Sequence, residues 1–194
     1  MHNCAGSIIN EWTVISAAHC FSPPNPTTVD EYLVFPGAHD STVLEKTDIK
    51  DYDGPLHKIH SLYFPKKWNH TQLFQDIAIL VMDKPFKFSD KIKPIKMMEY
   101  QDSASQMRVG KKCKVAGWGK VESTFNGSVV PTDYDDKYPV FLQEVEVPII
   151  DLEKCIKNYE DSNEGVIPTN LNFCAGKQGI DSCGVIQRIQ RSTK

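Results

Sequence analysis

The residue with the clearest chemical potential is His19, in the segment Trp12-Thr-Val-Ile-Ser-Ala-Ala-His19-Cys20. A short apolar run leads into two alanines, whose small side chains allow close backbone packing while the imidazole projects into a cleft. An imidazole is a candidate general base, because its ordinary pKa lies close to physiological pH. A lone histidine beside a cysteine is more often structural, so this assignment needs support from other residues.

Two aspartates are the carboxylates that could complete such a site. Asp76 opens the apolar run of residues 77–82, where it is either a surface group at a strand end or a buried partner of a histidine. Asp181 lies two residues before Cys183 and, taken alone, would be a turn residue. Neither aspartate identifies a site by itself.

The apolar segments are short and rich in β-forming residues, and clusters of Pro, Gly, Asn and Asp separate them. This pattern predicts an all-β sandwich or barrel with long loops. Asp151 could cap one short helix over residues 151–159, and the polar residues 97–112 could link two halves. The expected strands are residues 12–16, 32–35, 77–82, 114–117 and 141–147.

Five segments stand in an order that is typical of one family. The segment around His19 resembles the signature of a catalytic histidine, and Asp76-Ile-Ala-Ile-Leu80 resembles a strand that carries a catalytic aspartate. Gly117-Trp-Gly119 resembles the start of a second barrel, and Phe173-Cys-Ala-Gly176 and Asp181-Ser-Cys183 resemble the approach to a specificity pocket. Nearly the whole chain thus resembles the chymotrypsin/trypsin-like serine proteases, the peptidase S1 family.

The resemblance implies an all-β fold of two antiparallel Greek-key β-barrels, with the active site between them. We expect an incomplete peptidase domain over residues 1–183, with one barrel over about 1–100 and the other over about 110–183. Residues 184–194 would be a divergent polar tail. Both barrels are expected to be incomplete, because the matching segments begin and end inside the family's usual limits.

The resemblance also implies the chemistry. His19 would be the general base of a serine endopeptidase, and Asp76 would fix its tautomer and stabilise the imidazolium. Asp181 would lie at the base of the pocket and select Arg or Lys by a charge-assisted pair. Substrates or inhibitors would be proteins or peptides. No cofactor is expected, and the chain would be a monomer.

The nucleophile is where the chain departs from the family. The family continues with Gly-Asp-Ser-Gly-Gly after the last motif, whereas this chain reads Gly184-Val-Ile-Gln-Arg-Ile-Gln-Arg-Ser-Thr-Lys194. Ser182 matches a pocket-wall position, and Ser192 lacks the surrounding glycines, so neither is assigned as nucleophile. We expect this form to be inactive. The alternatives are a non-catalytic homologue that acts as a binding or decoy protein, and a truncated product without function.

A shift of reading frame would explain the divergent tail. Gly184-Val-Ile-Gln187 can be encoded by codons that read Gly-Asp-Ser in a shifted frame. Sequencing of the transcript across this junction tests the idea, and a shifted frame without a protease-like continuation would reject it.

Six cysteines suggest an oxidising, extracellular compartment. The family pairing would join Cys4 to Cys20 and Cys155 to Cys174, which leaves Cys113 and Cys183 unpaired. Two sequons make Asn69 and Asn126 glycosylation candidates. No signal peptide is readable after Met1, so we expect that the natural N-terminus lies elsewhere.

Composition excludes several other functions. The net charge is −3 and no long basic run occurs, so nucleic-acid binding is not expected. The longest apolar run, residues 77–82, is too short to span a bilayer. No paired C-x-x-C spacing supports a zinc site. The remaining histidines lie in polar or loop-like surroundings and are assigned no metal; they are His2, His39, His57, His60 and His70.

Overall fold

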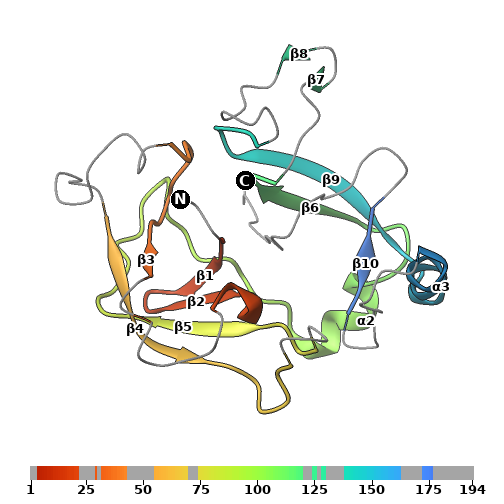
Figure 1. Ribbon diagram of the computed structural model, residues 1–194, viewed down its shortest axis with the longest axis horizontal. Helices are drawn as coiled ribbons and strands as arrows, with labels where there is room; N and C mark the ends of the chain where they lie inside the picture. The colour runs from red at the N-terminus through yellow and green to blue at the C-terminus, as the bar shows by residue number, and fades with distance from the viewer. Residues whose placement is uncertain are drawn as a thin grey trace.

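The computed structural model describes residues 4–21, 29, 32–42, 55–69, 74–119, 124–125, 128–129, 138–162 and 172–176. These residues form a mostly β structure with two antiparallel sheets, which lie on opposite sides of Figure 1. The first sheet has the strand order β1-β2-β5-β4-β3. Its strands are β1 Ser7–Asn10, β2 Thr13–Ser16, β3 Leu33–Val34, β4 His57–Tyr63 and β5 Ala78–Met82.

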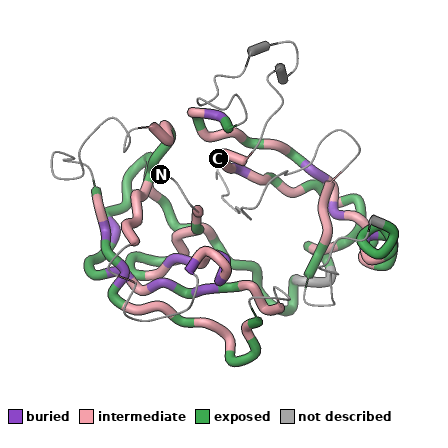
Figure 2. The backbone as a smooth tube through the Cα atoms, viewed as in Figure 1, coloured by how far each residue is buried: buried purple, intermediate pink, exposed green. Residues whose placement is uncertain are grey.

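The alternation of side chains along β5 explains how the first sheet forms its core. Ala78, Leu80 and Met82 are buried, whereas the intervening Ile79 is 41% exposed, as the two-residue repeat of a strand requires. The buried residues of β5 pack with Val14 of β2 and other apolar side chains. Figure 2 shows the buried positions concentrated along these neighbouring strands.

The second sheet has the order β10-β9-β6 and is built on one long pairing. Strand β6, Lys112–Gly117, pairs along its whole length with β9, Gln143–Ile150, and β10 is Cys174–Ala175. Exposed Lys–Glu pairs cross the β6–β9 ladder at 2.6 and 2.8 Å. Strands β7, Thr124–Phe125, and β8, Ser128–Val129, form a separate pair.

Helices are few among the described residues. Helix α3, Leu152–Ser162, follows β9, and the Asp151 carboxylate accepts a hydrogen bond from the Lys154 N–H at 3.0 Å. This is the N-terminal cap that the sequence predicted, because a side-chain oxygen satisfies one of the free N–H groups of the first turn. Helix α2, Ser103–Gln106, follows a short 3₁₀ turn, Tyr100–Asp102, between the sheets. No described helix is both long and apolar enough to cross a membrane.

The five expected strands are all present in part, but the sequence did not predict β1, β4 or the short strands β7, β8 and β10. The observed β2, β3, β5, β6 and β9 overlap the five predicted runs. The prediction for β4 was wrong, because its residues, His-Lys-Ile-His-Ser-Leu-Tyr, were interpreted as loop and strand start. Strand β1 was also missed, since four residues between Gly6 and a turn give too little alternation to recognise.

A short seam joins the two sheets. The Ser41 N–H donates to the Val140 carbonyl at 2.9 Å, and the Leu142 N–H donates to the His39 carbonyl at 2.9 Å. The His39 ring stacks on Phe141 with 5.4 Å between centroids. His39 therefore has a packing role at this seam.

His57 is the buried polar residue of the first sheet. It is 4% exposed, its ring packs on Phe86 with 4.5 Å between centroids, and its Nδ1–H donates to the Lys84 carbonyl at 3.1 Å. Burial is the main cause that lowers the pKa of His57, and the Lys84 charge adds to it, while the hydrogen bond and Asp83 oppose it. The folded state therefore favours the neutral ring.

Acid should weaken the fold through His57. Because its folded pKa is lowered, its contribution to stability is present above the ordinary pKa of 6.5 and is lost as pH falls from that value through the lower pKa of the folded state. We therefore compare the free energy of unfolding of the wild type with that of the His57→Gln variant. The difference between them should fall by at most about 1.4 kcal/mol for each unit by which the pH is lowered. Urea unfolding between pH 8 and pH 5 measures this difference, and a difference that stays constant would contradict it.

Candidate active site

His19 is held by the sharp turn that ends β2. The strand stops at Ser16, and Ala18–Cys20 form one 3₁₀ turn. Ala17 and Ala18 are 5% and 0% exposed, so larger side chains at these positions would displace the neighbouring backbone. The two alanines thus allow the close backbone packing that the sequence predicted. His19, the middle residue of the 3₁₀ turn, is half-buried.

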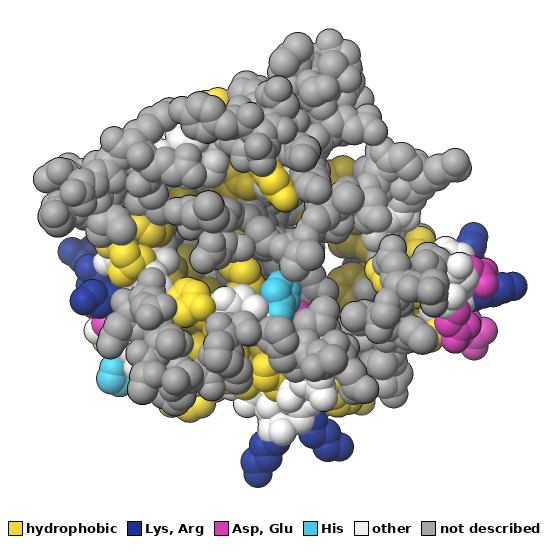
Figure 3. Space-filling model, in the orientation of Figure 1, with side chains coloured by type: hydrophobic (Ala, Val, Ile, Leu, Met, Phe, Trp, Pro, Cys, Tyr) yellow, Lys and Arg dark blue, Asp and Glu magenta, His cyan; other side chains and the backbone are white. Residues whose placement is uncertain are grey.

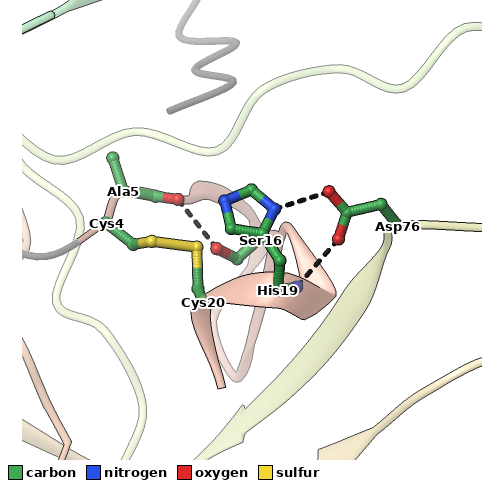
Figure 4. A network of polar contacts seen from close by, with 6 residues as sticks. All are labelled: Cys4, Ala5, Ser16, His19, Cys20 and Asp76. Atoms are coloured by element: carbon green, nitrogen blue, oxygen red, sulfur yellow. Dashed lines mark hydrogen bonds and ion pairs between the residues drawn. A yellow bond between two sulfur atoms is a disulfide. The ribbon is translucent and has the colours of Figure 1, made fainter. Parts of the chain in front are cut away.

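A disulfide and a hydroxyl fix the chain beside this turn. Cys4 and Cys20 are bonded, which confirms the predicted pairing, and the Ser16 hydroxyl donates to the Ala5 carbonyl at 2.8 Å (Figure 4). At Gly6 a side chain would have no room, because a Cβ would lie 2.8 Å from the Ile15 carbonyl oxygen. The sequence analysis did not single out Ser16, although it lies inside the recognised motif.

Removal of the Cys4–Cys20 disulfide should destabilise the fold and loosen His19. The double variant Cys4→Ala/Cys20→Ala opens a loop with a sequence separation of 16, and loss of such a crosslink costs about 3 kcal/mol. Urea unfolding measures the loss, and NMR titration reports the pKa of His19. The control is Cys155→Ala/Cys174→Ala, with a separation of 19. It should lose similar stability without changing the His19 titration; equal effects of both variants on His19 would contradict the expectation.

Asp76 reaches His19 through a tight turn before β5. Gln75 has φ 55°, a left-handed conformation that is uncommon for a residue other than glycine. The Ile77 N–H donates to the Gln75 carbonyl at 2.7 Å, which closes the turn. Since Ala78 pairs with Ser16 in the β2–β5 ladder, the end of one strand and the start of the other lie side by side. This register places Asp76 next to His19.

Two hydrogen bonds join the carboxylate to the histidine (Figure 4). Asp76 Oδ2 lies 2.6 Å from His19 Nδ1, and Oδ1 accepts the backbone N–H of His19 at 2.8 Å. Only 16% of the His19 side chain and 13% of the Asp76 side chain are exposed. The carboxylate therefore fixes both the position of the residue and the orientation of its ring.

The pKa shifts of the pair follow from these contacts. The hydrogen bond to Asp76 raises the pKa of His19, and the Asp76 charge adds to this effect, although burial opposes both. Burial is the largest single influence on Asp76 and acts to raise its pKa. The hydrogen bonds from the side chain and backbone of His19 outweigh it, so the net pKa of Asp76 is lowered. Asp76 is thus a carboxylate at neutral pH, and it stabilises a proton on His19.

The other ring nitrogen of His19 is in position to act as a base. With Nδ1–H donating to Asp76, the neutral ring carries its lone pair on Nε2. This atom is buried and has no hydrogen-bond partner within the described part of the chain. A hydroxyl placed at Nε2 could transfer its proton to the ring, which is the first half of general base catalysis.

A metal does not fit the same group of residues. Cys4, His19 and Cys20 lie close enough for their ligand atoms to surround an ion. However, the two sulfurs are bonded to each other at 2.02 Å, so neither is a thiolate that could bind a metal.

The structure describes some of the other predicted residues and not others. The Cys155–Cys174 disulfide is present as predicted, and Cys113 is free. Asn69 is exposed and forms an antiparallel bridge with Phe74. The remaining predicted positions lie outside the described residues; they are Asn126, Asp181, Ser182, Cys183 and the tail from Gly184 to Lys194.

An antiparallel β fold with a half-buried carboxylate–imidazole pair at the ends of two adjacent strands defines the class of this protein. The family model described as Trypsin matches residues 1–184, so the chain belongs to the trypsin family. It is 31% identical over 188 residues to "Trypsin zeta" of Drosophila melanogaster, covering 94% of this chain and 58% of that protein. It is 29% identical over 189 residues to "Clotting factor G beta subunit" of Tachypleus tridentatus, covering 93% of this chain and 53% of that protein. The chain thus spans only a little over half the length of these two curated relatives.

Proposed function

We propose that this chain carries the base and the orienting carboxylate of a trypsin-like endopeptidase, but does not cleave peptide bonds in this form. The observation that supports the proposal most strongly is the contact of 2.6 Å between His19 Nδ1 and Asp76 Oδ2, together with the buried Nε2. The two residues come from distant parts of the sequence, and a carboxylate at Nδ1 selects the tautomer whose Nε2 lone pair can accept a proton.

In a complete site these residues would act in a fixed order. Nε2 of His19 would accept the proton of a serine hydroxyl as that oxygen attacks the scissile carbonyl carbon. Asp76 would stabilise the resulting imidazolium without taking the proton itself. The imidazolium would then protonate the leaving amine, which completes the cleavage and leaves an acyl-enzyme for water to hydrolyse.

Specificity for Arg or Lys would come from Asp181. A carboxylate at the base of a narrow pocket can pair with a guanidinium or ammonium group, and such charge-assisted bonds are strong when water is excluded. The support is the position of Asp181 two residues before Cys183, in the motif shared with the family. The proposed substrates are therefore proteins or peptides with a basic residue at the cleaved bond.

The nucleophile and the oxyanion donors are the parts that this sequence does not supply. The residues after Cys183 are Gly184-Val-Ile-Gln-Arg-Ile, in place of a Gly-Asp-Ser-Gly-Gly segment. Without that segment His19 has no hydroxyl to activate, and the backbone N–H groups that would stabilise the tetrahedral oxyanion are not provided either. The same sequence favours a second candidate, a non-catalytic homologue that binds substrates or inhibitors as a decoy.

The proposal includes the architecture and the compartment. Two Greek-key barrels, over about residues 1–100 and 110–183, are supported by the two antiparallel sheets. An extracellular setting is supported by the two disulfides. Glycosylation of Asn69 would fit this setting, because the residue is exposed. Treatment of the secreted chain with peptide N-glycosidase F should then lower its mass, whereas an unchanged mass would reject glycosylation.

Labelling with a serine-directed phosphonate separates the candidate functions. The native secreted protein is treated with the probe, and its intact mass is measured. A stable 21.9 kDa chain without an adduct supports the inactive or decoy forms. A longer, labelled chain indicates that the gene produces an active enzyme, and an adduct on the 21.9 kDa chain itself would reject our proposal. Retention of the unlabelled chain on an immobilised trypsin inhibitor then supports the decoy function.

A further inference from the structure

Two sulfurs and one ring nitrogen lie together beside the turn that ends β2. One ligand atom from each of Cys4, His19 and Cys20 lies within 4.8 Å of the other two. Cys4 precedes β1 and Cys20 follows β2, and these two strands pair with each other. The disulfide joins the two cysteines across this hairpin, with 6.1 Å between their Cα atoms. The pairing of the strands therefore fixes where the three side chains meet.

The histidine of this group has the tautomer that a metal ligand requires. Asp76 Oδ2 lies 2.6 Å from His19 Nδ1, so the neutral ring carries its lone pair on Nε2. Nε2 is buried and has no hydrogen-bond partner within the described residues. Figure 4 shows this nitrogen on the side of the ring that faces away from Asp76, towards Cys4 and Ala5. Histidines that bind zinc usually donate their other ring N–H to a carboxylate or carbonyl in this way, because the contact orients the ring and makes the metal-binding nitrogen more basic.

The dimensions of the group suit zinc once the sulfurs are no longer bonded. Zinc binds thiolate sulfur at about 2.3 Å and imidazole nitrogen at about 2.0–2.1 Å in a tetrahedron, which places the ligand atoms roughly 3.5–3.8 Å apart. In the disulfide the two sulfurs are 2.02 Å apart, so no ion fits between them. Rotation about a Cα–Cβ bond moves a sulfur far enough to open this space, and it leaves the backbone in place.

The surroundings of the group allow a reductant and a cation to reach it. Cys4 and Cys20 are both partly exposed, whereas Cys155 of the other described disulfide is 3% exposed. Among the described residues, this is the one group of three such side chains close enough to share an ion. On the face seen in Figure 3, the described Lys and Arg side chains lie at the rim, and the middle is hydrophobic with a histidine. The described charges that would repel a cation therefore lie away from the middle of this face.

We propose that reduction of the Cys4–Cys20 disulfide creates a zinc site formed by both thiolates and Nε2 of His19. A dithiol reductant gives up two electrons and two protons: its own S–S bond forms, the Cys4–Cys20 bond breaks, and each cysteine becomes a thiol. Zn²⁺ displaces the two thiol protons and binds the thiolates, with water as the fourth ligand. The ion replaces the disulfide as the crosslink of the hairpin and occupies the lone pair that a base needs. This inference concerns metal binding alone and does not rest on the proposed function.

Zinc binding to the full chain tests the role of the two cysteines. The chain is reduced with a dithiol and freed of it without air, and competition with a chromophoric chelator measures the Kd for Zn²⁺. The reduced wild type should bind Zn²⁺ at least about 100-fold more tightly than the oxidised chain, because only thiolates are ligands. The reduced variant Cys4→Ser/Cys20→Ser should lose this tight site. The matched control Cys155→Ser/Cys174→Ser, which also removes one disulfide, should keep it.

The third ligand is tested on the His19 ring. In ¹⁵N NMR of the reduced wild type, one equivalent of Zn²⁺ should shift the Nε2 signal of His19, while Nδ1 keeps the proton that it donates to Asp76. The His19→Ala variant should bind Zn²⁺ at least about tenfold more weakly than the wild type. The control His60→Ala replaces an exposed histidine and should leave the Kd unchanged.

Several outcomes overturn the proposal. They are equal binding by the reduced and oxidised chains, tight binding by Cys4→Ser/Cys20→Ser, and loss of the site in the Cys155→Ser/Cys174→Ser control. An Nε2 signal of His19 that zinc leaves unchanged overturns it without the use of any variant. Because reduction removes a crosslink, circular dichroism follows the fold before and after zinc is added. A reduced chain that is unfolded and stays unfolded with zinc also overturns the proposal.

Discussion

The purified chain should hydrolyse arginyl and lysyl peptides about 10⁶-fold more slowly than a trypsin-family enzyme with a serine nucleophile. This ratio corresponds to roughly 8 kcal/mol of activation free energy. The physical reason is that Nε2 of His19 has a lone pair but no hydroxyl to deprotonate among the described residues. Release of a fluorophore from arginyl and lysyl amides, followed over days, measures the rate.

The control for this rate is the His19→Ala variant. General base catalysis usually raises a rate by 10²–10⁴-fold. If His19 has no nucleophile to activate, it makes no such contribution, and its removal should leave the residual rate unchanged within about twofold. A measurable rate that falls with His19→Ala would show that another hydroxyl in this chain acts as the nucleophile. That result would contradict the proposed inactivity while leaving the role of His19 intact.

Replacement of Asp76 by alanine should lower the free energy of unfolding by about 3 kcal/mol. The carboxylate accepts the backbone N–H and the ring Nδ1–H of His19, and both donors lie in a half-buried site. Donors left without a partner cost about 1–3 kcal/mol each. The pKa of His19 should also fall, because burial, which lowers it, would then act without the opposing hydrogen bond.

Asp83 provides the matched control for Asp76. Its carboxylate also accepts a backbone N–H, that of Lys58 at 3.0 Å, but the contact is exposed to water. Asp83→Ala should therefore cost less than about 1 kcal/mol, because water replaces the lost acceptor. Urea unfolding of the two variants compares the losses. Equal losses would mean that the Asp76–His19 contact contributes no more than an exposed one.

The pair at the site was predicted from the family resemblance, because the segments around both residues match the family's motifs. His19 follows an apolar run and two alanines, and Asp76 precedes another apolar run. In the structure the two runs become β2 and β5, which pair directly, and the Ser16–Ala78 register brings His19 and Asp76 together. The Cys4–Cys20 disulfide was predicted from the pairing that the family resemblance implies.

Features that depend on tertiary contacts were not predictable from these patterns. Strand β4 was missed because His57 and His60 hide its alternation, and only the structure shows that His57 packs on Phe86. The left-handed turn at Gln75 gives no signal in the sequence, because glycine or asparagine is usual at such a position.

The tautomer and pKa of His19, measured together by ¹⁵N NMR of the imidazole, test the central claim most directly. Above its pKa the ring should carry its proton on Nδ1, because that atom donates to Asp76, and Nε2 should have the shift of an unprotonated nitrogen. The pKa should lie above the ordinary value of 6.5. A neutral ring protonated on Nε2, or a pKa at or below 6.5, would mean that Asp76 does not hold His19 as a base.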